Sequence, residues 1–209
     1  MYLTQIMLAN TVGINYIIAD CQRMHTLVMS GFPSGDSETP RSDMAVLYDV
    51  EPTRSGVRVL IQSDIAPNID AYRMYCARNT EPCVKNISAL SEVLQNGMKL
   101  RFSVCANPTV QQSHTHGPRS ARRFISDYDQ RQRWLKRKLA EGGADLNMAI
   151  ETGSDTVRGK RKDAPLKFIG VRWAGVLTIT DAKAFERLLR TGLGPERAYG
   201  MGMLTLQRY

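Results

Sequence analysis

The sequence predicts an α+β fold built from two consecutive units with one order of elements: strand, helix, strand, strand, helix, strand. Three observations support this prediction. Runs of β-forming residues alternate with helical patterns in that order, once in each half of the 209-residue chain. A candidate linker, residues 88–97, separates the two sets. An apolar content of 43% is ample for a hydrophobic core. We therefore expect an N-terminal domain at residues 1–92 and a C-terminal domain at residues 93–209.

The first unit begins with a strand pattern and a well-capped helix. Asp20 is a suitable N-cap for the helix that follows it, and Pro33 with the polar loop behind it ends that helix. The two middle runs are separated by a turn that contains proline, which predicts a hairpin. The expected strands are residues 2–8, 44–50, 56–64 and 83–87, and the expected helices are residues 21–32 and 69–78.

The second unit repeats this order. Its first helix is amphipathic and is closed by Gly142 and Gly143, and Asp181 caps its second helix. The apolar residues of that second helix fall on one face: Ala184, Phe185, Leu188 and Leu189. The expected strands are residues 98–108, 146–151, 167–180 and 199–207, the helices are 128–143 and 182–192, and a loop or extended hairpin tip lies between the middle strands. Two βαββαβ units in tandem are the ferredoxin-like plan.

The net charge points to an anionic partner. A formal charge of +8 and a pI near 9.5 favour nucleic acid over a membrane surface. The apolar N-terminus lacks a basic n-region and a cleavage site, and no window approaches the length of a membrane span, so we expect a cytoplasmic protein without membrane contact. The four cysteines form no C-x-x-C pair and match no zinc module, which predicts reduced thiols.

Basic residues are bunched into three groups. Such runs are usually solvated faces, and we expect part of the second group to be only that. The third group differs because no acidic residue lies between Asp155 and Asp163, and because Gly159 makes it flexible. A mobile basic hairpin suits contact with a phosphate backbone, with an affinity that falls steeply with salt. The groups are Arg119, Arg122 and Arg123; Arg131, Arg133, Lys136, Arg137 and Lys138; and Arg158, Lys160, Arg161 and Lys162.

A glycine-rich segment, residues 192–206, lies between the last helix and the last strand. Its glycines let the backbone turn tightly and let a ligand approach main-chain N–H groups. Taken alone, the segment also fits a helix C-cap followed by a strand with a bulge. It is no P-loop, because the Lys-Ser/Thr pair is missing. Arg197 lies at its centre, between the glycines Gly192, Gly194, Gly200 and Gly202.

His25 is the candidate for proton transfer. At 100° per residue it falls on the edge of the apolar stripe of its helix, so it can face a cleft. An imidazole can accept a proton from a ribose 2′-hydroxyl or give one to a 5′-oxygen. The alternative is a boundary histidine that hydrogen-bonds a carbonyl.

The other histidines and the carboxylates indicate no metal site. His114 and His116 lie two residues apart in a polar loop without a third ligand, so we assign them no catalytic role. Asp127 and Asp129 lie at a helix start, where they favour the helix dipole. Two-metal hydrolysis therefore finds no support.

Six separated segments together resemble the CasE family of CRISPR-associated endoribonucleases, of the repeat-associated RAMP superfamily. They are MYLTQI, MHTLVMSGFP, LRFSVCANPT, RQRWLKRKLAEGGADL, GVLTITDAKAF and GLGPERAYGMGMLTL. The resemblance implies two ferredoxin-like domains and metal-independent cleavage of the CRISPR repeat hairpin in precursor RNA, without a cofactor. It also implies that the protein retains the product as a subunit of the type I-E Cascade complex.

The resemblance assigns roles to individual residues. His25 matches the catalytic histidine, Arg197 matches the basic residue of the glycine-rich loop, and residues 158–162 match the region that grips the RNA stem. The family has a tyrosine three residues before the histidine, whereas this chain has Gln22 there. Glutamine can hydrogen-bond a phosphate oxygen but cannot act as an acid. Either His25 works with another partner, with Tyr16 and Arg23 nearest, or cleavage is slower.

Two other functions remain open at the level of sequence. A subunit that binds the RNA hairpin without cutting it would explain Gln22. A basic scaffold or ribosome-associated protein with tandem ferredoxin-like domains would explain the charge, and it would not prefer one hairpin over generic RNA.

Overall fold

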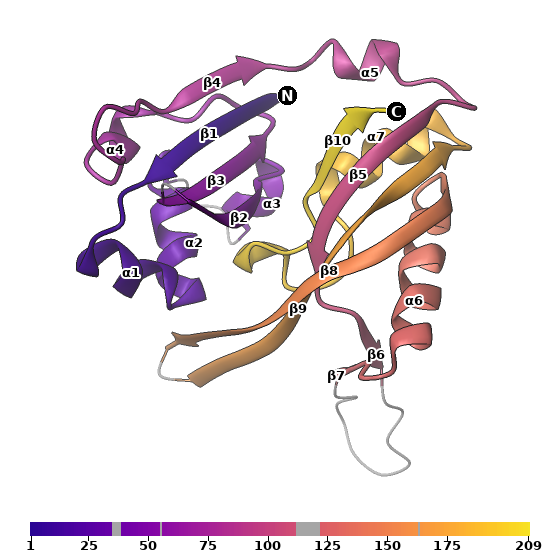
Figure 1. The fold of residues 1–209 in the computed structure, drawn as a ribbon. Coiled ribbons are helices and arrows are strands. Elements are labelled where there is room, and N and C mark those ends of the chain that lie inside the picture. The colour runs from indigo at the N-terminus through magenta and orange to yellow at the C-terminus, as the bar shows by residue number, and fades with distance from the viewer. Residues whose placement is uncertain (35–38, 55, 112–121, 163) are drawn as a thin grey trace.

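The computed structural model describes residues 1–34, 39–54, 56–111, 122–162 and 164–209 (Figure 1). It is a mixed α/β structure with a four-stranded antiparallel sheet in each half of the chain. The N-terminal elements are β1 (Tyr2–Leu8), α1 (Val12–Ile18), α2 (Cys21–Met29), α3 (Pro40–Asp43), β2 (Leu47–Thr53), β3 (Gly56–Ser63), α4 (Asp70–Arg73) and β4 (Cys83–Asn86). The others are α5 (Leu90–Val93), β5 (Lys99–Ala106), β6 (Thr109–Gln111), β7 (Arg122–Phe124), α6 (Tyr128–Glu141), β8 (Ala144–Arg161), β9 (Ala164–Ile179), α7 (Ala182–Thr191), the 3-10 helix η1 (Arg197–Tyr199) and β10 (Leu204–Arg208).

The N-terminal sheet has the strand order β2-β3-β1-β4, and all neighbours are antiparallel. Alternate residues of the central strands point to one face, where Ile6 pairs in register with Val59 and both are fully buried. Helix α2 packs on that face through Met24 and Val28. The predicted helix after Asp20 is therefore confirmed, and its apolar stripe is the surface that holds it against the sheet.

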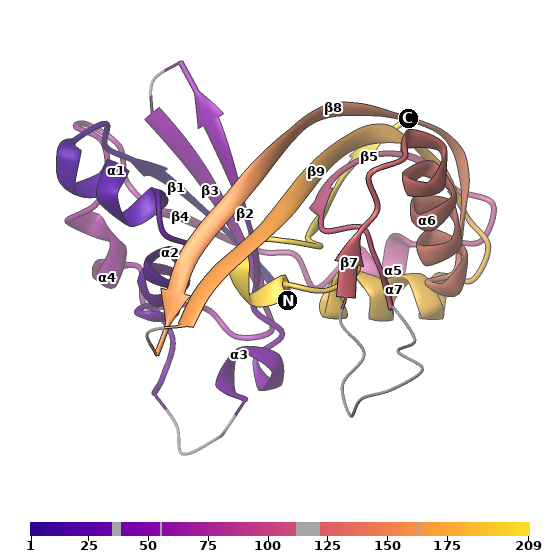
Figure 2. The same cartoon turned by 90° about the horizontal axis from the view of Figure 1, so that it is seen from below.

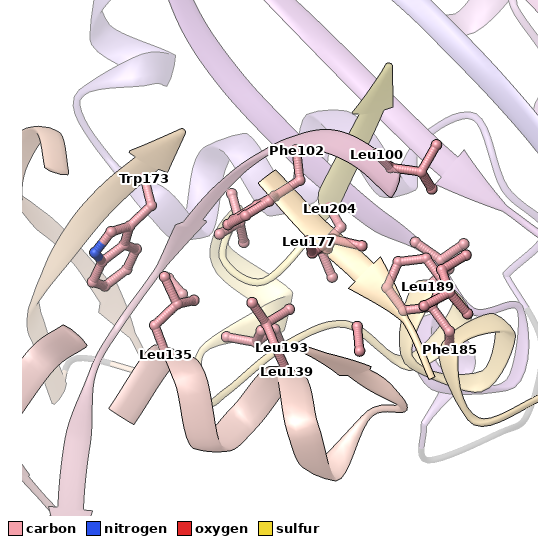
Figure 3. Close-up of a cluster of buried hydrophobic side chains, with 14 of the residues drawn as sticks. Leu100, Phe102, Leu135, Leu139, Trp173, Leu177, Phe185, Leu189, Leu193 and Leu204 are labelled. Atoms are coloured by element: carbon pink, nitrogen blue, oxygen red, sulfur yellow. The ribbon is translucent and has the colours of Figure 1, made fainter. Parts of the chain in front are cut away.

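The C-terminal sheet has the strand order β10-β5-β9-β8, again with antiparallel neighbours. Helices α6 and α7 pack on the same face, and their side chains share one core with the strands (Figure 3). Trp134 of α6 stacks on Trp173 of β9 with ring centroids 6.2 Å apart. The predicted face of α7 is confirmed where it is most apolar, since Phe185 and Leu189 are buried.

The longest strands, β8 and β9, form a hairpin that reaches across to the N-terminal half, where its end lies beside α2 (Figures 1 and 2). The sequence predicted shorter strands with a loop or extended hairpin tip, and the extended hairpin is what forms. Gly159, which was expected to make the hairpin tip flexible, lies inside β8. Its hydrogen faces α2: a Cβ there would lie 2.7 Å from Sγ of Cys21 and 3.0 Å from Oδ1 of Asp20. Glycine is needed at position 159 because a side chain there would prevent the close approach of β8 to α2.

Polar contacts join the two halves beside the hairpin. The guanidinium of Arg172 in β9 donates two hydrogen bonds, of 2.8 and 2.7 Å, to the carboxylate of Asp49 in β2. Asp49 is buried, and Arg172 is about a quarter exposed at 24%. The amide of Gln62 donates to the carbonyl of Leu189 over 2.6 Å. These bonds fix the N-terminal sheet against the C-terminal one.

Several expected elements differ from the observed ones. The last strand begins at Leu204 rather than residue 199, because η1 and glycines with positive φ occupy the start of that stretch. The second strand starts at Leu47, after Ala45 with φ of 49°. The helix expected at residues 69–78 is the single turn α4, and the candidate linker contains α5. Elements α1, α3, β6 and β7 were not expected. In the described ranges, no helix is long and apolar enough to cross a membrane.

Candidate functional site

Helix α2 positions His25. Its N-cap, Asp20, accepts hydrogen bonds from the backbone N–H groups of Gln22 at 2.8 Å and Arg23 at 3.1 Å, which fixes the first turn. The buried residues of the helix are Cys21, Met24, Leu27 and Val28. His25 is half-buried at the edge of that face, where the periodicity of the sequence placed it.

The glycine-rich segment positions Tyr199. All four of its predicted glycines adopt the left-handed region, with φ between +76° and +84°. At Gly200 the space is also needed, since a Cβ would lie 3.0 Å from the ring of Tyr48 in β2. The hydroxyl of Tyr48 donates to the carbonyl of Ala198 over 3.1 Å. The segment is thus held against the N-terminal sheet, and η1 carries Tyr199 to the side of α2.

Tyr199 joins His25, Gln22 and β9 in one cluster. Its ring meets the imidazole edge-on, with centroids 6.1 Å apart and planes at 71°. Its hydroxyl donates to Oε1 of Gln22 over 3.3 Å. On another side, its ring lies 6.0 Å from that of Phe168. Residues from both halves of the chain therefore form this cluster.

Burial and nearby charges shift the pKa values of His25 and Tyr199 in opposite directions. Burial lowers the pKa of His25, and the positive charges of Arg41 and Arg161 lower it further, although the backbone at Ala198 acts in the opposite sense. Burial is also the main cause that raises the pKa of Tyr199, against the effect of Arg161. At neutral pH the imidazole is uncharged and the phenol protonated. Such a pair can act as base and acid.

The backbone at Ala198 is the polar neighbour of the imidazole ring. The Nδ1 atom of the ring is buried and makes no hydrogen bond of ordinary geometry to any described residue. The Ala198 backbone is near enough to favour the charged ring without closing such a bond. The alternative of a boundary histidine that hydrogen-bonds a carbonyl therefore stays open beside the catalytic one.

A basic cavity of about 1020 Å³ lies beside this cluster, between the hairpin end, η1, α6 and α7. Tyr199 and Arg161 line the cavity, whereas His25 does not. Because the Tyr199 ring also contacts His25, it lies between the cavity and the imidazole. Of its two acidic residues, Glu141 is paired with Arg137 and Lys138. Its basic residues are Arg41, Arg122, Arg137, Lys138, Arg161, Arg187 and Arg197. This excess of positive charge suits a polyanion.

The structure brings together only part of the predicted site. Near His25 lie Gln22, Arg161 and the glycine-rich segment with Arg197, whose guanidinium donates to the carbonyl of Thr191 over 2.8 Å. The other basic side chains are exposed: Arg158, Lys160 and Lys162 at the hairpin end, Arg122 and Arg123 on β7, and Lys136 on α6. Arg119, His114 and His116 lie outside the described residues.

Tyr16 and Arg23, the expected partners of His25, contact each other instead. The guanidinium of Arg23 lies 3.5 Å from the centroid of the Tyr16 ring and donates to the Tyr16 carbonyl over 3.2 Å. Within the described residues, no hydrogen bond, ion pair or ring contact joins either of them to His25. Their supporting role stays a prediction.

Two residues of the site escaped the sequence analysis. Tyr199 was assigned to a strand, and the only signal was its place inside the glycine-rich segment. Arg41 lies in the single turn α3, whose sequence carries no functional pattern; its guanidinium donates to the carbonyl of Val46 over 2.8 Å. Both reach the site through tertiary packing.

The described residues contain no group of three or more histidine, cysteine, aspartate or glutamate side chains that could hold a metal ion. All four cysteines are free thiols, as the sequence predicted. Burial raises the pKa of Cys21 to about 11 and that of Cys105 to about 12, so these two thiols are poor nucleophiles at neutral pH.

Comparisons with known proteins bear on the whole chain. A family model described as "CRISPR associated protein" matches residues 1–208. The CRISPR-associated endoribonuclease Cse3 of Thermus thermophilus is 26% identical, over 81% of this chain and 94% of that protein. A structure of CRISPR endoribonuclease Cse3 bound to a 19-nucleotide RNA has a TM-score of 0.82 at 24% identity, covering 99% of this chain and all of that one.

A chain of a CRISPR RNA-guided surveillance complex has a TM-score of 0.71 at 20% identity, with full coverage of both chains. At these identities, the two structural likenesses show a shared fold. The family match confirms the resemblance that the six sequence segments indicated.

Proposed function

Because the chain belongs to the family of CRISPR-associated proteins, we propose that it is a metal-independent endoribonuclease that cuts the repeat hairpin of precursor CRISPR RNA and keeps the product as a Cascade subunit. The observation that carries the proposal is the cluster in which His25 of the N-terminal half meets Tyr199 and the basic hairpin of the C-terminal half, beside the basic cavity. The relative from Thermus thermophilus is named as an endoribonuclease, which supports the same activity here.

The chemistry follows from an uncharged imidazole beside positive charge. His25 accepts the proton of the ribose 2′-hydroxyl, and the 2′-oxygen attacks the adjacent phosphorus. Arg161, Arg41 and Arg197 stabilise the extra negative charge of the phosphorane. The products carry a 2′,3′-cyclic phosphate and a 5′-hydroxyl. No metal or cofactor enters this scheme.

We assign RNA binding to the basic groups that the sequence singled out. Arg161 and Arg197 line the cavity and contact the RNA near the cut. The exposed side chains at the hairpin end and on α6 and β7 contact the phosphate backbone of the stem, which is read by shape more than by sequence. The described members of this set are Arg122, Arg123, Lys136, Arg158, Lys160, Arg161, Lys162 and Arg197.

We also propose that each half is a ferredoxin-like domain, with the boundary near residue 92. Numbering the four strands of each half in chain order gives the spatial order 4-1-3-2 in both sheets, with antiparallel neighbours throughout. This shared order fits the βαββαβ ferredoxin-like plan in both halves.

The test is a cleavage assay on the cognate repeat hairpin. We expect cutting at one position, unchanged by EDTA, and products with cyclic phosphate ends. A hairpin with 2′-deoxyribose at the scissile nucleotide is expected to bind and stay whole. Cleavage of that substrate would contradict attack by the 2′-hydroxyl, and dependence on a metal would contradict the acid–base scheme.

A second function, a hairpin-binding subunit without cleavage, is favoured by one observation: Gln22 supplies no proton where the family has a tyrosine. It predicts tight binding to the hairpin, preference over generic RNA, and no product at any enzyme concentration.

A further inference from the structure

A hydroxyl that the sequence analysis did not use lies where the reaction needs a proton donor. When the phosphorus–oxygen bond breaks, the 5′-oxygen leaves as an alkoxide unless a group protonates it. His25 is occupied as the base in the proposed reaction. Tyr199 lies against His25 on one side and lines the basic cavity on the other.

We propose that Tyr199 is a second catalytic residue, which protonates the leaving 5′-oxygen, and that Gln22 is a positioning residue that orients the Tyr199 hydroxyl. This inference rests on the proposed function and names a residue for a step that the proposed function leaves unassigned.

The neighbouring side chains cannot supply that proton. Gln22 has no acidic proton, and the guanidinium groups of Arg41 and Arg161 stay positively charged and do not release a proton in proteins. Tyr48 is buried and does not line the cavity, so its hydroxyl cannot reach a bound RNA. Cys21 lies on the buried face of α2. Among the described groups around His25, Tyr199 remains.

The hydrogen bond to Gln22 sets the direction of the Tyr199 hydroxyl. The ring is held by its contacts with His25 and Phe168, and these contacts would be the same for phenylalanine. The oxygen alone distinguishes the two residues, and it is within 3.3 Å of Oε1 of Gln22. A phenol is protonated at neutral pH, and burial raises the pKa of Tyr199 further above its ordinary value.

The proton balance of the step is closed. The 2′-hydroxyl proton moves to the imidazole, the bond between 2′-oxygen and phosphorus forms, and the bond between phosphorus and 5′-oxygen breaks. The phenol proton moves to the 5′-oxygen. The imidazolium then loses its proton to water and the phenolate regains one from water, which restores both residues for the next reaction.

The test compares Tyr199→Phe with the wild-type protein under single-turnover conditions, on two repeat hairpins. One has the natural 5′-oxygen at the cut, and the other has sulfur there, whose thiolate leaves without protonation. We expect Tyr199→Phe to cut the oxygen substrate about 10²–10⁴-fold more slowly, and to cut the sulfur substrate at the wild-type rate. Binding of the uncleavable 2′-deoxy hairpin is expected to be unchanged.

Three results would overturn the assignment. Wild-type rates of Tyr199→Phe on the oxygen substrate would remove Tyr199 from the reaction. Equal losses on both substrates would make it a positioning residue rather than a proton donor. A wild-type protein that binds the hairpin but cuts neither substrate would instead refute the proposed endoribonuclease function, and the assignment with it.

Two further variants keep the test decisive if Tyr199→Phe folds poorly. Gln22→Met keeps Tyr199 and removes the acceptor of its hydrogen bond, so we expect a smaller loss that also disappears on the sulfur substrate. Full activity of Gln22→Met on the oxygen substrate would show that Gln22 does not orient the donor. Tyr209→Phe is the matched control, because Tyr209 is 70% exposed and its ring lies near Arg101, away from the cluster; it is expected to cut at the wild-type rate.

Discussion

The two halves have the same strand order but differ in their middle hairpin. In the N-terminal half, β2 and β3 have 7 and 8 residues, whereas β8 and β9 in the C-terminal half have 18 and 16. The differences are 11 residues between β8 and β2 and 8 residues between β9 and β3. At about 3.3 Å per residue, they extend the strands by roughly 26 to 36 Å. The N-terminal half provides a compact platform for His25, and the C-terminal half provides the reach that brings cationic side chains to it.

The largest expected effect tests whether the chemistry belongs to the N-terminal half. We expect His25→Ala to lower the single-turnover cleavage rate by about 10³–10⁴-fold, because it removes the base. Binding of the 2′-deoxy hairpin is expected to change less than about threefold. Equal losses of binding and cleavage would indicate a structural histidine and would remove the division of roles between the halves.

The contact between the halves is tested through Asp49. Asp49→Asn leaves the Arg172 guanidinium without its carboxylate, and we expect a loss of about 3 kcal/mol in the free energy of unfolding, the lower end for buried pairs because Arg172 is partly exposed. Chemical denaturation of the wild type and of Asp49→Asn measures this loss in the free energy of unfolding.

The matched control lies in the same strand. Glu51 pairs with Arg58, and both side chains are about two-fifths exposed, at 41% and 38%. Glu51→Gln is expected to cost less than about 1 kcal/mol. Equal losses for the two variants would contradict a specific role for the contact between the halves.

The reach of the long hairpin is tested at Gly159. The added methyl group of Gly159→Ala collides with Cys21 and Asp20 of α2, so the hairpin end is displaced from His25. We expect cleavage to slow by about tenfold, since misplaced groups lose orientation.

Gly153→Ala is the control for this displacement. It lies in the same strand, a Cβ there has nothing within 4 Å, and its φ is not positive. Its rate is expected to equal that of the wild type, as measured by single-turnover cleavage. A loss of similar size in Gly153→Ala would refute the specific contact with α2.

The smallest effect concerns pH. The pKa of His25 is lowered from its ordinary value near 6.5, so the neutral base is fully present at pH 7 and is lost as the pH falls through the lowered pKa. The cleavage rate is therefore expected to level off above pH 6.5 and to fall on the acid side.

Arg161→Gln removes one of the positive charges that depress this pKa. We expect the acid limb of the pH–rate profile to move to higher pH in this variant. An unchanged limb would mean that Arg161 does not act on the imidazole.

The sequence predicted most of the elements of both halves, because their signals are local. Asp20 and Asp181 capped helices where expected, and the apolar periodicity of α2 placed His25 at the edge of the buried face. The full length of the long hairpin could not be predicted in this way. Its outer part is exposed on both faces, so the sequence there lacks the alternation that marks a half-buried strand.

The partner of His25 could not be predicted either. Gln22, Tyr16 and Arg23 were proposed because they are near in sequence, whereas Tyr199 arrives from the other end of the described chain. Its position depends on η1, on positive φ at Gly200, and on contact with Tyr48. Such contacts join residues some 150 positions apart and leave no periodic trace in the sequence.

The pairing of residues 25 and 199 also sets an order of events during protein synthesis. All four strands of the first sheet, and His25 with them, lie within residues 2–86 and are translated before the rest of the chain. Tyr199 lies 177 positions after Gln22, which is in the same helix as His25. The phenol is therefore translated long after the imidazole that it contacts. A truncated nascent chain therefore carries His25 without Tyr199, and the pair forms only after the glycine-rich segment has emerged and docked.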